Sequence, residues 1–153
     1  MFTLKRPLTL ALCGAGILLL GCGKSDDTSA ESADAAGLSP ADVAGTWNAR
    51  AVPFSGDTTP TTFTLIATNS TDGWTLTYPN RPPLSTGVTF DGDSVITDTG
   101  PYESVRRKGV QVRVNGAFRL QPDGTLAGTS LARYATKGVD SVQRFRVTAS
   151  RAP

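Results

Sequence analysis

Hydrophobic and polar positions alternate most strictly between Val110 and Leu120. The even-numbered residues of this segment are hydrophobic apart from Gly116, and the odd-numbered residues are mostly polar. A period of two is that of a β-strand with one buried and one solvated face. Asn115-Gly116 is typical of a hairpin turn, but the alternation continues in phase across it. We therefore expect one long strand with a bend or bulge at Gly116.

Shorter alternating segments lie on both sides of this strand, and each ends in turn-forming Gly, Asp, Asn or Pro residues. We expect Asp98-Thr99-Gly100-Pro101 to form the turn that ends the segment Ser94–Thr97. After Pro40 no segment keeps the apolar spacing of a helix. The expected strands are Thr46–Phe54, Thr61–Thr68, Trp74–Tyr78, Thr86–Phe90, Ser94–Thr97, Thr125–Tyr134 and Val139–Ala149.

About eight strands in the roughly 114 residues from Pro40 to Pro153 predict one all-β domain with an antiparallel meander. Closing the meander into a small barrel removes the unpaired edge strands that promote association. A β-sandwich of two sheets is the alternative, because alternation alone does not separate the two architectures. We expect a monomer.

The N-terminal segment has a different pattern. Lys5 and Arg6 precede an apolar run of about 13 residues, which suits a signal peptide and is shorter than the ~20 residues of a membrane-spanning helix. The run ends in Leu19-Leu20-Gly21-Cys22, which resembles the lipobox of bacterial lipoproteins. That resemblance implies removal of residues 1–21 and acylation of Cys22 with a diacylglyceryl group and an N-acyl chain such as palmitate. An ordinary cleaved signal peptide and an uncleaved anchor are the alternatives.

Residues 22–39 are small, polar and acidic, so they cannot bury enough apolar surface to fold and are expected to form a flexible tether. The residue after the cysteine is Gly23 and not Asp. In Gram-negative lipoproteins this implies sorting to the outer membrane, so we expect an anchor on its periplasmic face or at the cell surface.

Gly45-Thr46-Trp47 at the start of the first strand resembles the Gly-x-Trp opening of lipocalins and the wider calycin group. The resemblance implies that Trp47 plugs the closed end of the barrel and that an arginine near the last strand packs over it. Arg144 and Arg146 are the candidates for that arginine. The alternative is that Trp47 is a core aromatic residue of another small β-fold.

The residue types for catalysis are scarce. The chain has no histidine, and Glu103 is the single glutamate after Pro40. Without histidine, the commonest general base and metal ligand near neutral pH is missing. We therefore predict no enzymatic activity, no cofactor and no metal.

Basic residues concentrate in the second half of the domain. Residues 40–100 carry two basic and six acidic residues, whereas residues 101–153 carry ten and three. The basic residues predicted to form a patch for an anionic envelope component or an acidic protein are Arg106, Arg107, Lys108, Arg113 and Arg119. The alternative is a solvated barrel exterior. Nucleic acid is excluded by the expected compartment.

Two functions remain at this stage. Because small barrels are usually filled by side chains, we expect a membrane-anchored, non-enzymatic lipoprotein that acts as an envelope interaction module through its exterior. The alternative is a lipocalin-like carrier of a small apolar ligand. The sequence assigns no ligand-binding residue.

Overall fold

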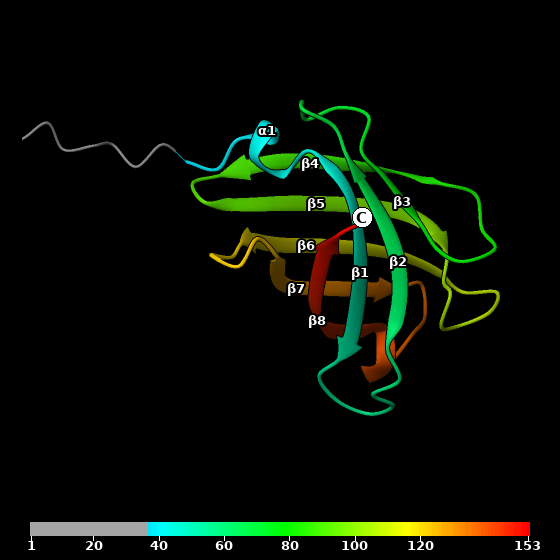
Figure 1. Cartoon of the computed structure of the whole chain (residues 1–153). Helices are drawn as coiled ribbons and strands as arrows, with labels where there is room; N and C mark the ends of the chain where they lie inside the picture. Colours follow the sequence, from blue (N-terminus) through cyan, green and yellow to red (C-terminus); the bar gives the residue numbers. More distant parts are fainter. Residues whose placement is uncertain (1–36) are drawn as a thin grey trace, which may run out of the picture. The chain divides into compact units, whose positions relative to one another are not determined.

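Eight antiparallel strands follow one another around a closed barrel, in which β1 pairs with β8 (Figure 1). The computed structural model describes residues 37–153, except for the side chain of Val139. The predicted signal peptide, Cys22 and most of the predicted tether lie outside the described residues. The elements are α1 (Pro40–Val43), β1 (Gly45–Pro53), β2 (Thr61–Ala67), β3 (Thr75–Thr77), β4 (Leu84–Asp91), β5 (Ser94–Glu103), β6 (Gln111–Leu120), β7 (Leu126–Tyr134), η1 (Val139–Ser141) and β8 (Val142–Arg151).

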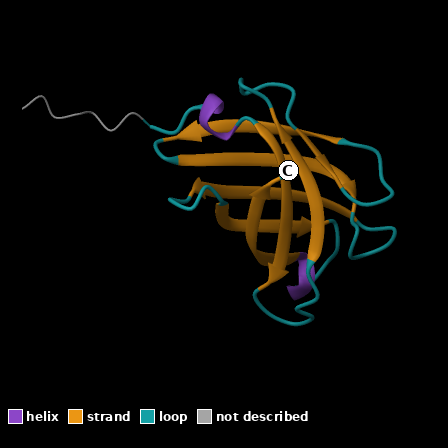
Figure 2. Cartoon of the chain, viewed as in Figure 1, coloured by secondary structure: helices purple, strands orange, loops and turns teal. Residues whose placement is uncertain are grey.

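The predicted meander and its closure are confirmed, and the sandwich alternative is wrong. Each strand pairs with its neighbours in the sequence, and the first and last strands close the sheet from Trp47 opposite Arg151 to Pro53 opposite Phe145. Nearly all regular structure in the described chain is strand (Figure 2). Closure gives every strand two partners, so the barrel has no open sheet edge.

The long strand β6 continues through Asn115-Gly116, as predicted, and forms no hairpin there. No bulge lies at Gly116, because the register with β7 is unbroken and that with β5 is regular around this residue. Gly116 instead leaves room inside the barrel. A Cβ at this position would lie 2.4 Å from the ring of Phe118, which occupies the next inward-facing position.

The predicted turn at residues 98–101 is wrong, since β5 continues to Glu103. The register with β6 shifts between Thr99 and Tyr102, and pairing resumes with Tyr102 opposite Val112. Gly100 has a φ of +112°, which strongly favours glycine. The turn-forming residues are therefore accommodated as an irregularity within a strand.

The start of the last strand also differs from the prediction. Residues 139–141 form the short helix η1, and β8 extends two residues beyond Ala149. Before β1, the single turn α1 is too short to show helical periodicity in the sequence. The backbone N–H and the hydroxyl of Ser39 both donate to the Asp42 carboxylate, at 2.8 and 2.6 Å, which fixes the start of this turn.

Inward-facing side chains form two hydrophobic clusters. The first lies at the end of the barrel that carries α1, which we call the α1 end, and includes the fully buried Val43, Trp47 and Trp74. The second lies toward the opposite end, which we call the mouth, and includes Tyr134 and Phe145. The mouth is surrounded by the loops of residues 54–60, 78–83, 104–110 and 135–141.

Candidate functional site: the interior cavity and its mouth

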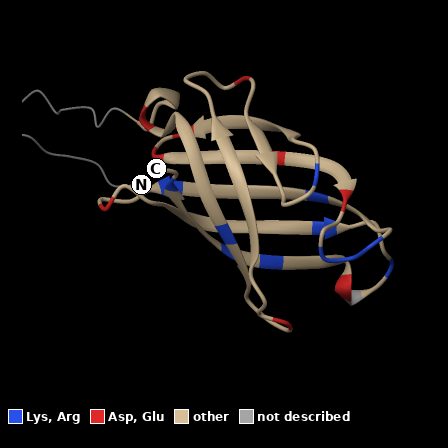
Figure 3. Ribbon diagram, turned by 45° about the vertical axis from the view of Figure 1, so that its right-hand side comes forward, with Lys and Arg blue, Asp and Glu red and all other residues tan. Residues whose placement is uncertain are grey.

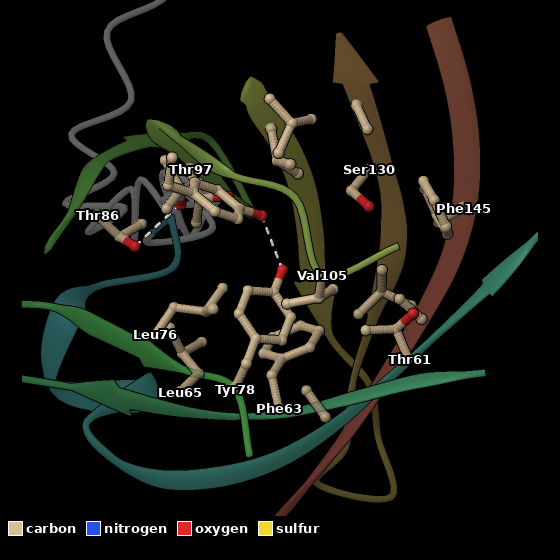
Figure 4. A pocket seen from close by; sticks show the side chains of 18 of the residues that line it. Thr61, Phe63, Leu65, Leu76, Tyr78, Thr86, Thr97, Val105, Ser130 and Phe145 are labelled. Carbon is tan, nitrogen blue, oxygen red and sulfur yellow. Dashed lines mark hydrogen bonds between the residues drawn. The ribbon is translucent and has the colours of Figure 1, made fainter. Parts of the chain in front are cut away.

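A cavity of about 80 Å³ lies inside the barrel and is lined by side chains from all eight strands (Figure 4). A cavity volume of roughly 10–15 Å³ holds one water molecule, and an engineered cavity of about 150 Å³ binds benzene. The interior therefore has room for several waters or a ligand of a few heavy atoms. A larger ligand requires a lining side chain to move.

The wall of the cavity is mostly apolar and carries two satisfied hydroxyl pairs. The Tyr78 and Tyr102 hydroxyls are 2.8 Å apart, and the Thr86 and Thr99 hydroxyls are 2.9 Å apart (Figure 4). Burial raises the pKa of both tyrosines above the usual value, so both phenols stay protonated near neutral pH. These pairs give the wall polarity without charge.

Two further hydroxyl-bearing residues of the cavity wall are labelled in Figure 4, Thr97 and Ser130. As whole residues they are 7% and 9% exposed, and neither hydroxyl forms a hydrogen bond within residues 37–153. No enclosed side-chain oxygen in the described chain lacks a partner, so these two oxygens are open to the accessible space of the cavity, where water or a ligand can satisfy them. The alternating pattern places both residues on inward faces, but the sequence does not show that their hydroxyls are unpaired.

Arg106 connects two loops across the mouth. Its guanidinium donates to the Thr59 carbonyl at 2.8 Å and the Thr61 hydroxyl at 3.1 Å, and it forms an ion pair with Asp57 at 3.1 Å. Hydrogen bonds from Thr59, with a contribution from Arg106, hold the pKa of Asp57 below its usual range. The guanidinium carbon of Arg106 also lies 5.8 Å from the ring centroid of Phe145, a residue of the cavity wall.

Two more arginines hold the loop of residues 104–110. The guanidinium of Arg107 lies 3.9 Å over the Tyr134 ring and donates to the Asp140 carbonyl at 2.7 Å. Arg81 donates to the carbonyls of Glu103 and Ser104. Basic segments accordingly gather in the loops away from the C-terminus in Figure 3. Three arginines thus tie one loop to the three loops around it.

The structure places the five residues of the predicted basic patch in two regions. Arg106, Arg107 and the exposed Lys108 lie in the mouth loop, whereas Arg113 and Arg119 lie on the outer face of β6. Arg113 forms a bidentate pair with Asp98, at 2.8 and 2.5 Å, which lowers the pKa of Asp98. Arg119 pairs with Asp93 at 3.3 Å. Three of the five charges are therefore already paired, and an anionic partner stays a prediction.

Trp47 is completely buried at the α1 end, where its indole N–H donates to the Val43 carbonyl at 2.8 Å. The arginine over its ring is Arg151, at 4.5 Å, and not Arg144 or Arg146 as expected. The reason is strand parity, because Phe145, Val147 and Ala149 face inward and Arg151 continues their face. Arg144 and Arg146 point outward.

Arg151 also closes the α1 end through hydrogen bonds. Its guanidinium donates to the Ala44 carbonyl at 2.6 Å and to the Asp42 carbonyl at 2.7 Å. It therefore joins the end of β8 to α1 and to the connection before β1. Alternation along the last strand places residue 151 on the inward face, but the predicted strand ended at Ala149.

Within residues 37–153 no group of three or more acidic, cysteine or histidine side chains is arranged to hold a metal ion, and no helix there is long and apolar enough to cross a membrane. Comparison of the chain with protein-family models, with curated proteins and with solved structures gives no significant match.

Proposed function

We propose that this protein is a lipid-anchored envelope lipoprotein whose barrel binds a small, largely apolar ligand in its interior. The observation that carries the binding proposal is the cavity of about 80 Å³, which leaves space inside a barrel of a size that side chains usually fill. The wall combines apolar side chains with a few polar groups, as ligand sites typically do. The carrier function is thus favoured over the filled module expected first.

Xenon tests the cavity, because it enters apolar cavities without specific polar recognition. We expect xenon to shift the amide NMR signals of inward-facing residues such as Gly116 and Val112 in the full chain. Ala132 lies in the wall, so Ala132→Leu is expected to fill the space and abolish these shifts. Ala127→Leu, at an outward-facing position of the same strand, is the matched control and is expected to leave the shifts intact. Xenon shifts that are absent, or unchanged in Ala132→Leu, would overturn the proposal.

The anchor is supported by the lipobox-like sequence alone and is tested separately. A chain that carries Cys22→Ser and an ordinary cleavable signal peptide in place of residues 1–21 is expected in the soluble fraction, because acylation at this thiol is the proposed attachment. Mass spectrometry of the membrane-bound wild type should show the added acyl groups. An unmodified Cys22 thiol would refute the anchor and leave the cavity proposal standing.

A second candidate function is contact of the mouth with an anionic membrane surface. Three of the large exposed hydrophobic residues, Phe54, Val105 and Val142, lie in or directly beside the mouth loops, and the exposed Lys108 lies in the same loop as Val105. Apolar and basic side chains on one surface favour association with anionic lipid. We expect the same non-acylated chain without residues 1–21 to sediment with phosphatidylglycerol vesicles, and Lys108→Glu combined with Val105→Ser to reduce this binding. No sedimentation with these vesicles would remove this candidate.

A further inference from the structure

Thr97, Gly116 and Ser130 form one row across the inner wall of the barrel. Thr97 on β5 pairs with Gly116 on β6, and Gly116 pairs with Ser130 on β7. Residues that pair across strands share a face, and neighbouring strands lie about 4.8 Å apart. Two hydroxyl-bearing residues therefore stand on the order of 10 Å apart, with bare backbone between them.

Gly116 gives the Thr97 hydroxyl its position. A Cβ on Gly116 would lie 2.6 Å from the Thr97 Oγ1 atom and 2.4 Å from the Phe118 ring. The hydroxyl and the ring thus share the space that a side chain at residue 116 would occupy. The glycine places a polar atom directly beside an aromatic wall inside the cavity.

The hydroxyls of this row differ from the others in the wall because they have no partner in the described chain. Thr97 and Ser130 are each more than nine-tenths buried, whereas the Thr86–Thr99 and Tyr78–Tyr102 pairs satisfy one another. Two hydroxyls that are open to the cavity and can both donate and accept therefore remain available to whatever occupies it.

The charge of the wall restricts what that occupant can be. Among the lining residues of the described chain Arg106 alone is charged, and its guanidinium is engaged by the loop of residues 54–60 and by Thr61. An ion placed at the row would lose its hydration without gaining a counter-charge. The row therefore suits an uncharged group.

We propose that Thr97 and Ser130 are the polar recognition element of the interior site: the Thr97 hydroxyl beside Gly116 binds the carbonyl or hydroxyl group of a small neutral ligand, and the Ser130 hydroxyl binds the same group through a water. The apolar part of the ligand packs on the Phe118 side of the cavity. A cavity of about 80 Å³ is well below the roughly 300–1,000 Å³ of drug-sized sites, which points to a short ketone, alcohol or amide. This inference rests on the proposed interior binding function.

Two probes of the same shape test it, since 2-butanone carries a carbonyl oxygen where 2-methyl-1-butene carries a methylene group. Each is titrated by NMR into the full chain, into the double variant Thr97→Val/Ser130→Ala and into Thr148→Val, an outward-facing control on β8. The double variant is expected to bind 2-butanone about tenfold more weakly, because one to two hydrogen bonds are lost. Its affinity for 2-methyl-1-butene is expected to be unchanged or higher, and Thr148→Val is expected to behave as wild type.

The outcomes separate this inference from the function on which it rests. If both probes bind and the double variant loses no preference for the ketone, the recognition element is refuted while interior binding stands. If neither probe nor xenon shifts the signals of wall residues, both proposals fail. Thr97→Ser retains the hydroxyl and is expected to retain the wild-type affinity for 2-butanone. Retained binding of 2-methyl-1-butene by the double variant excludes a folding defect as the cause of its loss of ketone binding.

Discussion

The two ends of the barrel are held by different interactions. At the α1 end Val43, Trp47 and Trp74 are at most 1% exposed, and both indole N–H groups donate to backbone carbonyls. At the mouth the loops are joined mainly by arginine side chains and their hydrogen bonds. Burial of large side chains contributes several kcal/mol, whereas contacts of partly exposed arginines typically contribute about 1 kcal/mol or less.

This difference shows how a closed barrel can be stable and still exchange a ligand. Every strand has two partners, so the backbone pairing does not distinguish one end from the other. The side chains make the distinction, because regions with few buried apolar contacts open at lower free energy than the core. The α1 end should therefore determine global stability and the mouth should determine access to the cavity.

Removing Trp47 at the α1 end should have the largest effect on stability. Trp47→Ala is expected to lower the free energy of unfolding by about 3–5 kcal/mol, because a fully buried side chain and the hydrogen bond to Val43 are lost together. Urea unfolding followed by circular dichroism measures the change. Ile66→Ala, at a position 45% exposed, is the control and should cost less than about 1 kcal/mol. Similar costs for both variants would contradict the assigned role of this end.

The arginine over Trp47 should have the next largest effect. Arg151→Met keeps an apolar stem but loses the contact with the ring and two hydrogen bonds, so we expect a loss of about 1–2 kcal/mol. Arg146→Met is the matched variant, because Arg146 stacks at 5.2 Å on the exposed Phe54 and should contribute about 0.5 kcal/mol or less. Urea unfolding that ranks the two variants in the reverse order would refute the assignment of Arg151.

Alternation along the chain was sufficient to predict the antiparallel meander, since the inward face of each strand must be apolar for the domain to have a core. It did not separate a barrel from a sandwich. It failed where turn-forming residues lie inside a strand. Gly100 and Pro101 indicate a turn in isolation, yet the pairing of β5 with β6 on both sides of them keeps the chain in the sheet. Tertiary pairing overrides the local preference there.

The candidate site was less predictable than the fold. Arg106 was identified from charge as part of a basic patch, but its contacts with Asp57 and Thr59 join loops that lie about 50 residues apart in the sequence. The size of the cavity depends on the side-chain volumes contributed by all eight strands. The alternation of hydrophobic and polar positions does not predict it. Alternation does place Thr97, Gly116 and Ser130 on inward faces, but their alignment in one row requires the register.

At the mouth, loss of an arginine should change dynamics more than stability. Arg106→Gln is expected to lower the free energy of unfolding by less than about 1 kcal/mol, because the Asp57 side chain with which it pairs is 68% exposed. Hydrogen exchange of the amides in loops 54–60 and 104–110 should become faster, and xenon should enter and leave the cavity faster. Lys108→Gln in the same loop is the control and should change neither rate. Unaltered exchange in Arg106→Gln would show that this arginine does not restrain the mouth.

The smallest effect expected is a loosening of the mouth in acid. The pKa of Asp57 is lower in the folded protein than in the unfolded chain, so its carboxylate stabilises the fold at pH values above the unfolded pKa of about 4. This contribution is lost as the pH falls through the lower folded pKa, because protonation weakens the bonds from Thr59 and removes the charge that Arg106 pairs with.

NMR titration of the carboxyl carbons gives the Asp57 pKa, and the amide signals of residues 54–60 report the loop at the same pH. We expect the two to change together below pH ~4. Asp57→Asn should remove the titration and give the loop its acid-state signals near neutral pH. Hydrogen bonds from Ser39 likewise lower the pKa of Asp42, at the other end of the barrel. Protonation there should perturb the signals of α1 while Trp47 stays buried, since the core of that end does not depend on a carboxylate.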